Sequence, residues 1–366
     1  MQAVTQRQSL KAGAATVDTS GACANPPTPD LTSIPTAVNE PQTSAAATVP
    51  TAQHSAQAQA GQPASLAKQW LETVQVLDGA LRDIGPDTPW MQRLTMAHER
   101  SLRLFGRQPD AALYWHIHRA AHSTEHYSSS HAMLCMLVAR EAALRLDWSA
   151  ERVNSLSLAA LTMNVSMRRL MDQLAAAELR VTAKVRSDIE SHAERSARVL
   201  AAAGVVDATQ IQIVRLHHDD VHAAKPLAQL DSAPAAARLL RRVDIFTAKL
   251  SRRAGRIPTS PMRAAREACL GAGGVPDEIG AALLKVMGLY PPGSCVELHC
   301  GEIGIVIGRG RQANMPIVAA LAGVGGAPLA EPAIRDTGDP EHGVKRAVGS
   351  DAIGIEPPHD ALMAPR

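Results

Sequence analysis

The chain builds its apolar segments almost entirely from aliphatic residues, and this restricts the folds that are open to it. Hydrophobic residues make up 46% of the 366 residues, whereas aromatic residues make up only 2%. Ala and Leu are strong helix formers, and the cores of strands usually draw on aromatic side chains. Apolar residues also recur at helical spacing over most of the region from 66 to 288. The sequence therefore predicts a mainly α-helical protein.

Charge and cysteine usage narrow the class of protein further. The net charge of +2 is too balanced to indicate nucleic-acid binding. The five cysteines are scattered without a Cys-x-x-Cys pair, which fits a reducing compartment better than a disulfide framework or a zinc site. The chain has no run of about 18 apolar residues and no signal-peptide pattern at its N-terminus. We therefore expect a cytoplasmic protein that binds neither nucleic acid nor a membrane.

Shifts in composition divide the chain into segments. Residues 1–64 are rich in Ala, Thr, Pro, Gln and Ser and contain no Phe, Trp or Tyr, so they cannot bury enough apolar surface to offset the entropy of ordering. Turn signals and changes in hydrophobic period set the later boundaries. The predicted segments are a disordered tail at 1–64, a helical lead-in at 65–122, a helical domain at 123–289, a small β appendix at 290–340 and a flexible tail at 341–366.

The β appendix is recognised by a change from helical to alternating periodicity. Residues 295–299 and 303–307 show period-two alternation around the turn Cys300-Gly301-Glu302. Residues 316–319 are a candidate third strand. Upstream, apolar spacing and capping residues predict helices at about 131–146, 149–164, 168–180, 182–203, 207–221, 235–253, 262–271 and 276–288.

Four histidines of the helical domain are candidate metal ligands: His131, His192 and the adjacent pair His217-His218. A single histidine on a helix is more often structural or solvated, whereas two adjacent imidazoles can reach metal ions from one turn. A site for two divalent ions needs nitrogen and oxygen ligands from several helices, with a carboxylate that bridges the ions. The order and spacing of the whole set therefore carry more weight than any one histidine.

In order and spacing, the chain from His131 to about residue 309 resembles the HD-GYP family, a group of HD-type metal-dependent phosphohydrolases. His131 stands where the family has a histidine near a helix start, and His192 where it has its third histidine. The family's segment Ala-Ala-Leu-Leu-His-Asp-Ile-Gly-Lys corresponds to Ala159-Ala160-Leu161-Thr162-Met163-Asn164-Val165-Ser166-Met167. Its His-His-Glu corresponds to His217-His218-Asp219, and its Asp-Val-Phe-Asp-Ala-Leu to Asp244-Ile245-Phe246-Thr247-Ala248-Lys249 after a matching Arg238.

The resemblance extends to the β appendix and carries expectations about fold and activity. Residues 288–298 and 301–304 look like the β-hairpin that closes many members of the family. The resemblance implies an HD-type helical bundle with this hairpin attached. Active members of the family hydrolyse cyclic di-GMP at a metal site built from the histidines and aspartates of these motifs.

The chain departs from the family pattern at the residues that carry this chemistry. Met163-Asn164 replaces the His-Asp pair, and Met167 replaces the lysine that would face the substrate phosphate. A thioether is a poor ligand for hard ions, and a neutral amide cannot bridge two cations as a carboxylate does. The Gly-Tyr-Pro signature is also missing from residues 219–226, which keep only Pro226.

The residues that remain define a reduced candidate site. The possible residual metal ligands are His131, His192, His217, His218 and Asp244, with Asn164 as a weak one. Such a set would hold one divalent ion, Mn, Fe or Mg. The other interpretation has no metal, with the histidines held by packing and hydrogen bonds alone.

A second candidate feature is a run of cations between residues 238 and 256. On one continuous helix, residues 238, 242, 249, 253 and 256 would fall roughly on one face, which could bind phosphate. The candidate phosphate-binding residues are Arg238, Arg242 and Arg253. The alternative is a solvated helix face, or one whose cations pair with acidic groups elsewhere in the fold.

Three functions are compatible with these features. The first is a degenerate HD-GYP-like signalling protein that hydrolyses nothing and binds a nucleotide second messenger of the cyclic di-GMP class or a protein partner. The second is an active metal-dependent phosphodiesterase with a reduced ligand set. The third is a pure interaction scaffold. The replacement of His-Asp by Met163-Asn164 favours the first.

Overall fold

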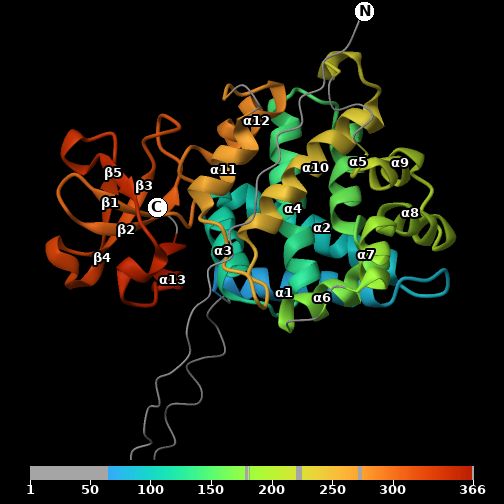
Figure 1. The fold of residues 1–366 in the computed structure, drawn as a ribbon, viewed down its shortest axis with the longest axis horizontal. Coiled ribbons are helices and arrows are strands. Elements are labelled where there is room, and N and C mark those ends of the chain that lie inside the picture. The colour runs from blue at the N-terminus through green and yellow to red at the C-terminus, as the bar shows by residue number, and fades with distance from the viewer. Residues whose placement is uncertain (1–64, 178–179, 181, 220–224, 271–273, 365–366) are drawn as a thin grey trace, which may run out of the picture. The chain divides into compact units, whose positions relative to one another are not determined.

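The computed structural model describes residues 65–177, 180, 182–219, 225–270 and 274–364. These residues form a helical body with one antiparallel sheet near the C-terminus (Figure 1). The mainly α-helical class with a small C-terminal β element, which the aliphatic composition and helical spacing predicted, is thereby confirmed. The tail predicted to be disordered, residues 1–64, lies outside the described residues.

The helices follow the apolar periodicity of the sequence. In chain order they are α1 (Leu66–Arg82), α2 (Trp90–Arg107), α3 (Pro109–His122), α4 (Tyr127–Arg145), α5 (Ala150–Thr162), α6 (Arg168–Ala176), α7 (Ala183–Glu190), α8 (His192–Ala202), α9 (Ala208–Leu216), α10 (Ser232–Leu250), α11 (Pro261–Cys269), α12 (Glu278–Met287) and α13 (His359–Leu362). Side-chain caps mark several starts. The Ser149 side chain accepts a hydrogen bond from the Arg152 amide at α5, and Asp207 accepts one from the Gln210 amide at α9.

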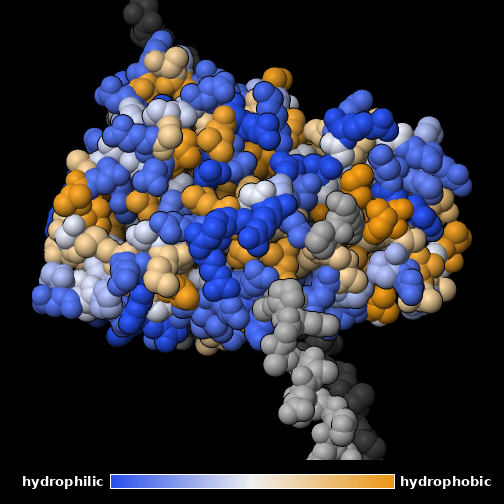
Figure 2. Space-filling model, turned by 180° about the vertical axis from the view of Figure 1, so that it is seen from behind, coloured by the Kyte–Doolittle hydropathy of each residue, from blue (hydrophilic) through white to orange (hydrophobic). Residues whose placement is uncertain are grey.

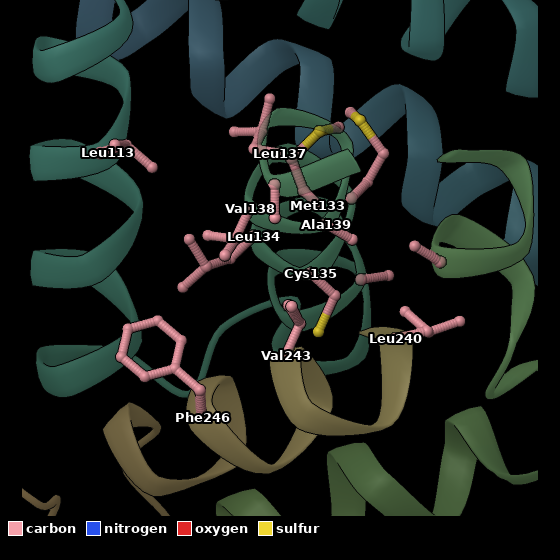
Figure 3. Close-up of a cluster of buried hydrophobic side chains, with 14 of the residues drawn as sticks. Leu113, Met133, Leu134, Cys135, Leu137, Val138, Ala139, Leu240, Val243 and Phe246 are labelled. Atoms are coloured by element: carbon pink, nitrogen blue, oxygen red, sulfur yellow. The ribbon is translucent and has the colours of Figure 1, made fainter. Parts of the chain in front are cut away.

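Helix α4 lies at the centre of the helical body and is buried around most of its circumference. It packs against α5, α10, α12, α1, α3 and α6. Figure 3 shows its apolar side chains between Leu113 of α3 and the residues Leu240, Val243 and Phe246 of α10. A helix that is apolar all round is suited to such a central place, because every face meets another element.

The helical lead-in belongs to the same core as the helices that follow. Residues from Trp70 of α1 to Met287 of α12 form one continuous buried cluster, and the described residues from 65 onward form one compact unit. On the face in Figure 2, hydrophilic residues cover most of the described surface, and hydrophobic residues lie among them in separate groups. Burial of aliphatic side chains from α1 to α12 is therefore the main force that holds the helical body together.

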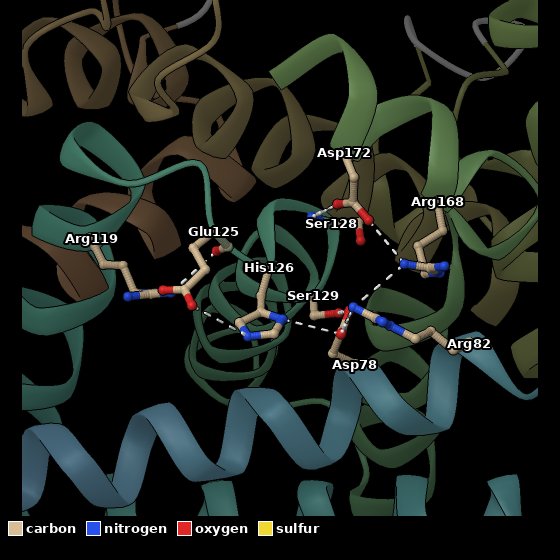
Figure 4. A network of polar contacts seen from close by, with 9 residues as sticks. All are labelled: Asp78, Arg82, Arg119, Glu125, His126, Ser128, Ser129, Arg168 and Asp172. Atoms are coloured by element: carbon tan, nitrogen blue, oxygen red, sulfur yellow. Dashed lines mark hydrogen bonds and ion pairs between the residues drawn. The ribbon is translucent and has the colours of Figure 1, made fainter. Parts of the chain in front are cut away.

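A network of polar contacts around Asp78 also ties α1 to α4 and α6 (Figure 4). The Asp78 carboxylate is only 3% exposed. It accepts hydrogen bonds from the Ser129 hydroxyl at 2.9 Å and from Nδ1 of His126 at 3.1 Å, and it pairs with Arg82 at 2.6 Å. Arg168 of α6 lies 3.8 Å away. Because His126 has a positive φ of 49°, this network also fixes an uncommon backbone conformation at the start of α4.

The sheet is larger than the hairpin that the alternating pattern predicted. Its strands are β1 (Cys295–Leu298), β2 (Ile303–Gly308), β3 (Ile317–Ala322), β4 (Pro328–Asp336) and β5 (Val344–Ala347), in the spatial order β4-β3-β2-β1-β5 with every pair antiparallel. The predicted hairpin is β1–β2, and the candidate third strand is β3. Strand β4 was not predicted, because most of its residues are exposed or half-buried and its apolar alternation is therefore weak.

The C-terminal segment 341–366, expected to be flexible, is ordered in its described part. Strand β5 pairs with β1 at the edge of the sheet. Downstream, Ile353, Leu362 and Met363 are buried in the main core. These apolar residues are too few and too widely spaced to give a periodic signal, and only the tertiary fold supplies the surfaces that bury them. The expectation of a flexible tail is corrected to this extent.

We predict that Asp78→Asn lowers the free energy of unfolding by about 3 kcal/mol, because it removes the buried anion that pairs with Arg82 and accepts the hydrogen bonds of Ser129 and His126. The measurement is urea unfolding followed by circular dichroism. The matched control is Asp83→Asn, since Asp83 also pairs with an arginine, Arg93, but its side chain is 54% exposed. The control should lose at most about 1 kcal/mol. Equal losses in both variants would contradict a structural role for the network.

A buried histidine gives the fold a dependence on pH. The His116 ring packs edge-on against Trp70 and Trp115, at centroid distances of 4.7 and 4.6 Å. Burial, assisted by the charge of Arg119, lowers the pKa of His116 from 6.5 to about 3. Between pH 6.5 and about pH 3, the His116 side chain is therefore protonated in the unfolded chain and neutral in the folded chain. The resulting stability is present above pH 6.5 and is lost as the pH falls below it.

We predict that His116→Phe loses roughly 2 kcal/mol less stability than the wild type between about pH 7 and about pH 5. Urea unfolding at a series of pH values measures the difference. His122→Phe, near the exposed end of the same helix, controls for the substitution itself. A His116→Phe curve parallel to that of the wild type would show that this ring does not carry the dependence.

Candidate metal centre

The structure brings the five predicted metal-ligand residues to one place between four helices. His131 lies in α4, His192 begins α8, His217 and His218 follow α9, and Asp244 lies in α10. They form two groups, within each of which the possible ligand atoms lie within 4.8 Å of one another: His192 with His217 and His218, and His131 with Cys135 and Asp244. Asp244 links the groups, because its Oδ2 is 4.0 Å from Nε2 of His218.

His192 and His217 are each oriented by the end of a helix. Nδ1 of His192 donates a hydrogen bond to the Ile189 carbonyl of α7 at 2.5 Å, and Nδ1 of His217 donates one to the Val214 carbonyl of α9 at 2.6 Å. The last carbonyls of a helix lack partners within the helix, so each imidazole satisfies one of them. These bonds place the ring proton on Nδ1 and leave Nε2 of both histidines as the atom with a free lone pair.

The two Nε2 atoms face each other at 3.1 Å inside the protein. Both rings are buried. Burial and the charge of neighbouring His218 lower the pKa of His217 to about 3, and burial also lowers the pKa of His192. Two neutral imidazoles therefore present lone pairs to each other at neutral pH, which is unfavourable unless a cation lies between them. This arrangement, with Nδ1 bound to a backbone carbonyl, is typical of histidines that ligate a metal.

His218 and Asp244 complete the donor set. The His218 ring packs against those of His217 and His192, at centroid distances of 4.2 and 4.8 Å. Burial lowers the pKa of His218, so it too can offer a neutral nitrogen. Its side chain is 42% exposed, which gives the site access to solvent. Burial opposes ionisation of Asp244, but a hydrogen bond from His131 and the nearby histidines hold its pKa well below the ordinary range, so it is a carboxylate.

His131 is separated from the other three histidines and orients the carboxylate instead. Its Nε2 is 2.7 Å from Oδ1 of Asp244 and 3.6 Å from Sγ of Cys135. Burial alone would lower the pKa of His131, but Cys135 and the bond to Asp244 outweigh it and raise the pKa well above its ordinary value. Cys135 was not predicted as part of the site. The signal that could have found it is its position four residues after His131, which is one helical turn.

Met163, Asn164 and Met167, which the motif comparison aligned with the His-Asp pair and lysine of the HD-GYP pattern, contribute packing. Met163 is the C-cap residue that follows α5, and it is fully buried in the apolar core. Asn164 is largely buried, and its carbonyl accepts a hydrogen bond from the Met167 amide in the short 3-10 turn Val165–Met167. Met167 packs against a small apolar cluster with Tyr127 and Met171. Within the described part of the chain, no hydrogen bond or ion pair joins these three residues to the four histidines.

The predicted cationic face is divided by the end of α10. The helix stops at Leu250 instead of about residue 253, and Arg253 donates a hydrogen bond to the Tyr127 hydroxyl at 2.6 Å. Arg242 forms two hydrogen bonds with Asp277, at 2.5 and 2.7 Å, and Arg238 lies 3.7 Å from the same carboxylate. The alternative in which the cations pair with acidic groups therefore describes Arg238 and Arg242. Arg253 belongs to a different part of the surface.

Arg238 and Arg242 nevertheless line a pocket of about 290 Å³ beside the candidate metal centre. The pocket is lined by the cations Arg238, Arg241, Arg242 and Lys249, by the acids Asp219 and Glu267, and by apolar residues of α9, α10 and α11. Asp219 directly follows His218, and the charge of Arg241 contributes to the low pKa of His218. The pocket therefore lies near His218, although none of the four histidines lines it.

Comparison of the chain with protein-family models, with curated protein sequences and with solved structures gave no match. The HD-GYP resemblance therefore remains a prediction from the motifs. Among the helices of the described residues, none combines the length and apolar character needed to cross a membrane.

Proposed function

We propose that this protein is a degenerate HD-GYP-like signalling protein that binds one divalent metal ion and a nucleotide of the cyclic di-GMP class without hydrolysing it. The observation that carries the proposal is the pair of Nε2 atoms of His192 and His217, which face each other at 3.1 Å with both Nδ1 atoms bound to backbone carbonyls. His218 and Asp244 supply a further nitrogen and a carboxylate oxygen. Imidazole with carboxylate suits Fe or Mn better than Mg.

The residues present fit one ion better than two. A pair of ions needs a carboxylate that bridges them, and the position of the family's bridging aspartate holds the neutral Asn164. Asp244 is the one carboxylate of the clustered groups that contain His131 and the facing histidines, and one of its oxygens already accepts a bond from His131. A bound ion would act as a Lewis acid toward a phosphate oxygen. His131 would keep Asp244 ionised and fixed in orientation.

The neighbouring cationic pocket supports a phosphate-bearing ligand. Its four cations outnumber the nearby acids, which are Asp219 and Glu267 in the lining and Asp277 beside Arg238 and Arg242, so the balance of charge favours an anion. Arg242 presents a planar guanidinium, which suits bidentate recognition of phosphate, although it is now bound to Asp277. A nucleotide phosphate would replace the Asp277 carboxylate as the partner of Arg242. It would then lie near an ion held by the histidine cluster.

We predict that the full-length protein, stripped of metal and titrated with Mn²⁺, binds one equivalent. His217→Ala should weaken this binding by about 100-fold, because it removes a ligand and exposes a helix-terminal carbonyl. Isothermal titration calorimetry and elemental analysis provide the measurements. His342→Ala is the matched control. His342 belongs to a separate cluster near the sheet, with Cys300 and Glu302, whose possible ligand atoms also lie within 4.8 Å of one another, and its loss should leave Mn²⁺ binding unchanged. Absence of bound Mn²⁺ from the wild type would refute the metal site.

We predict no turnover when the same Mn²⁺-loaded samples are incubated with cyclic di-GMP and the products are separated by chromatography. The double variant Met163→His/Asn164→Asp restores the family's residues, and it should bind a second equivalent and gain measurable hydrolysis. Hydrolysis by the wild type that His217→Ala abolishes would instead establish the second candidate, a phosphodiesterase with a reduced ligand set. That candidate has in its favour that three histidines and a carboxylate are enough to ligate one catalytic ion.

We predict that Arg242→Ala weakens cyclic di-GMP binding about tenfold, since a charge-assisted hydrogen bond contributes roughly 1.5–3 kcal/mol. Equilibrium dialysis measures the affinity. Arg198→Ala is the control: Arg198 also forms an ion pair, with Glu194, but its side chain is 73% exposed and neither residue lines the pocket. If neither variant nor wild type binds the nucleotide or metal, the scaffold function gains support.

A further inference from the structure

A second, larger cavity lies on another side of the helical body, against the sheet. Its volume is about 710 Å³, and α3, residues 252–262 after α10, strands β1 and β2, and residues 347–357 line it. It shares no lining residue with the candidate metal centre or with the cationic pocket. The cavity is therefore separate from both of those sites.

Beside the cavity, the chain that leads into the sheet approaches α3 closely at one glycine. Gly293 has a φ of +88°, and a Cβ there would lie 3.2 Å from Cγ2 of Ile117. This contact seats the start of β1 against α3. The inner wall is apolar and rigid, because Ile117, Ile305 and Ile353 line the cavity and are almost fully buried in the main core. The size and the mainly apolar lining are those of small-molecule pockets.

One buried polar atom in the wall lacks a partner. Ser294 lines the cavity and is 1% exposed, and its Oγ has no hydrogen-bond partner among the described residues. A buried hydroxyl without a partner is unfavourable, and few such groups occur in folded proteins. A ligand with an acceptor atom at its polar end would satisfy this hydroxyl.

The mouth of the cavity combines apolar and cationic side chains. Ile257 is 90% exposed and Ile355 is 37% exposed, although both are large and apolar. Arg252 is exposed, and its guanidinium forms no ion pair or side-chain hydrogen bond with the residues that the structure describes. Glu356 is the one acid among the lining residues, and its charge acts on His359. Arg252 therefore presents a positive charge to a ligand at the mouth of the cavity.

We propose that this cavity binds a small amphiphile with an apolar body and a carboxylate head, of the class of medium-chain fatty acids. The apolar body packs against the isoleucines of the wall. The carboxylate accepts hydrogen bonds from the Arg252 guanidinium and from the Ser294 hydroxyl. Arginine is suited to this role because its planar fork matches the two carboxylate oxygens.

Calorimetric titration of the full-length protein with three ligands of equal chain length tests the proposal. Octanoate, 1-octanol and octylammonium share the apolar body and differ in the charge of the head. We expect saturable binding of one equivalent of octanoate, binding of octanol about tenfold weaker, and still weaker binding of octylammonium. No saturable octanoate binding, or tighter binding of octylammonium than of octanoate, would overturn the proposal.

Variants locate the binding within the cavity. Arg252→Ala should weaken octanoate binding about tenfold and leave octanol binding unchanged, whereas Ala121→Trp should fill the cavity and abolish both. Arg266→Ala, an exposed arginine of α11 outside the lining, is the control. Ser294→Ala keeps the volume of the side chain, so it tests the site even if the tryptophan variant does not fold. Octanoate affinity unchanged in both Arg252→Ala and Ser294→Ala would contradict the assignment.

Discussion

The packing of α10 against α4 is the contact on which the rest of the structure depends. Helix α4 is buried around most of its circumference, and α10 contributes Leu240, Val243 and Phe246 to the core beside it. Asp244 directly follows Val243, so the same apolar contact carries its carboxylate to His131. The free energy of aliphatic burial thus offsets the cost of placing an ion pair inside the protein.

The ends of two other helices provide the second half of the candidate metal centre. His192 and His217 each stand three residues after the carbonyl that their Nδ1 atoms bind, at the ends of α7 and α9. The hydrogen bonds that complete these helix ends also select the tautomer and direct both Nε2 atoms inward. A structural and a ligating role are therefore compatible in the same ring. The site therefore holds its geometry through the ends of α7 and α9, without a contribution from Met163 or Asn164.

The fold class and the members of the histidine cluster could be predicted from the sequence. Features that depend on long-range contacts could not. The order of His131, His192, His217, His218 and Asp244 was enough to predict a common site. The separation of His131 from the other histidines was not predictable, because it depends on which oxygen of Asp244 each imidazole approaches. The prediction that Arg253 shares a helix face with Arg238 and Arg242 was wrong, since α10 ends before Arg253. Strand β5 was not predicted, because a short edge strand gives no periodic signal.

The sequence by itself determined that the protein is mainly helical, because aliphatic residues at helical spacing leave few other ways to bury apolar surface. It also determined that the end of α5 offers no carboxylate to a metal ion, since Met163 and Asn164 are neutral. Only the tertiary structure decided that two imidazoles face each other at 3.1 Å and that Ser294 is left without a partner beside an apolar cavity. These features depend on distances between residues far apart in the chain, which are set by packing and not by local preference.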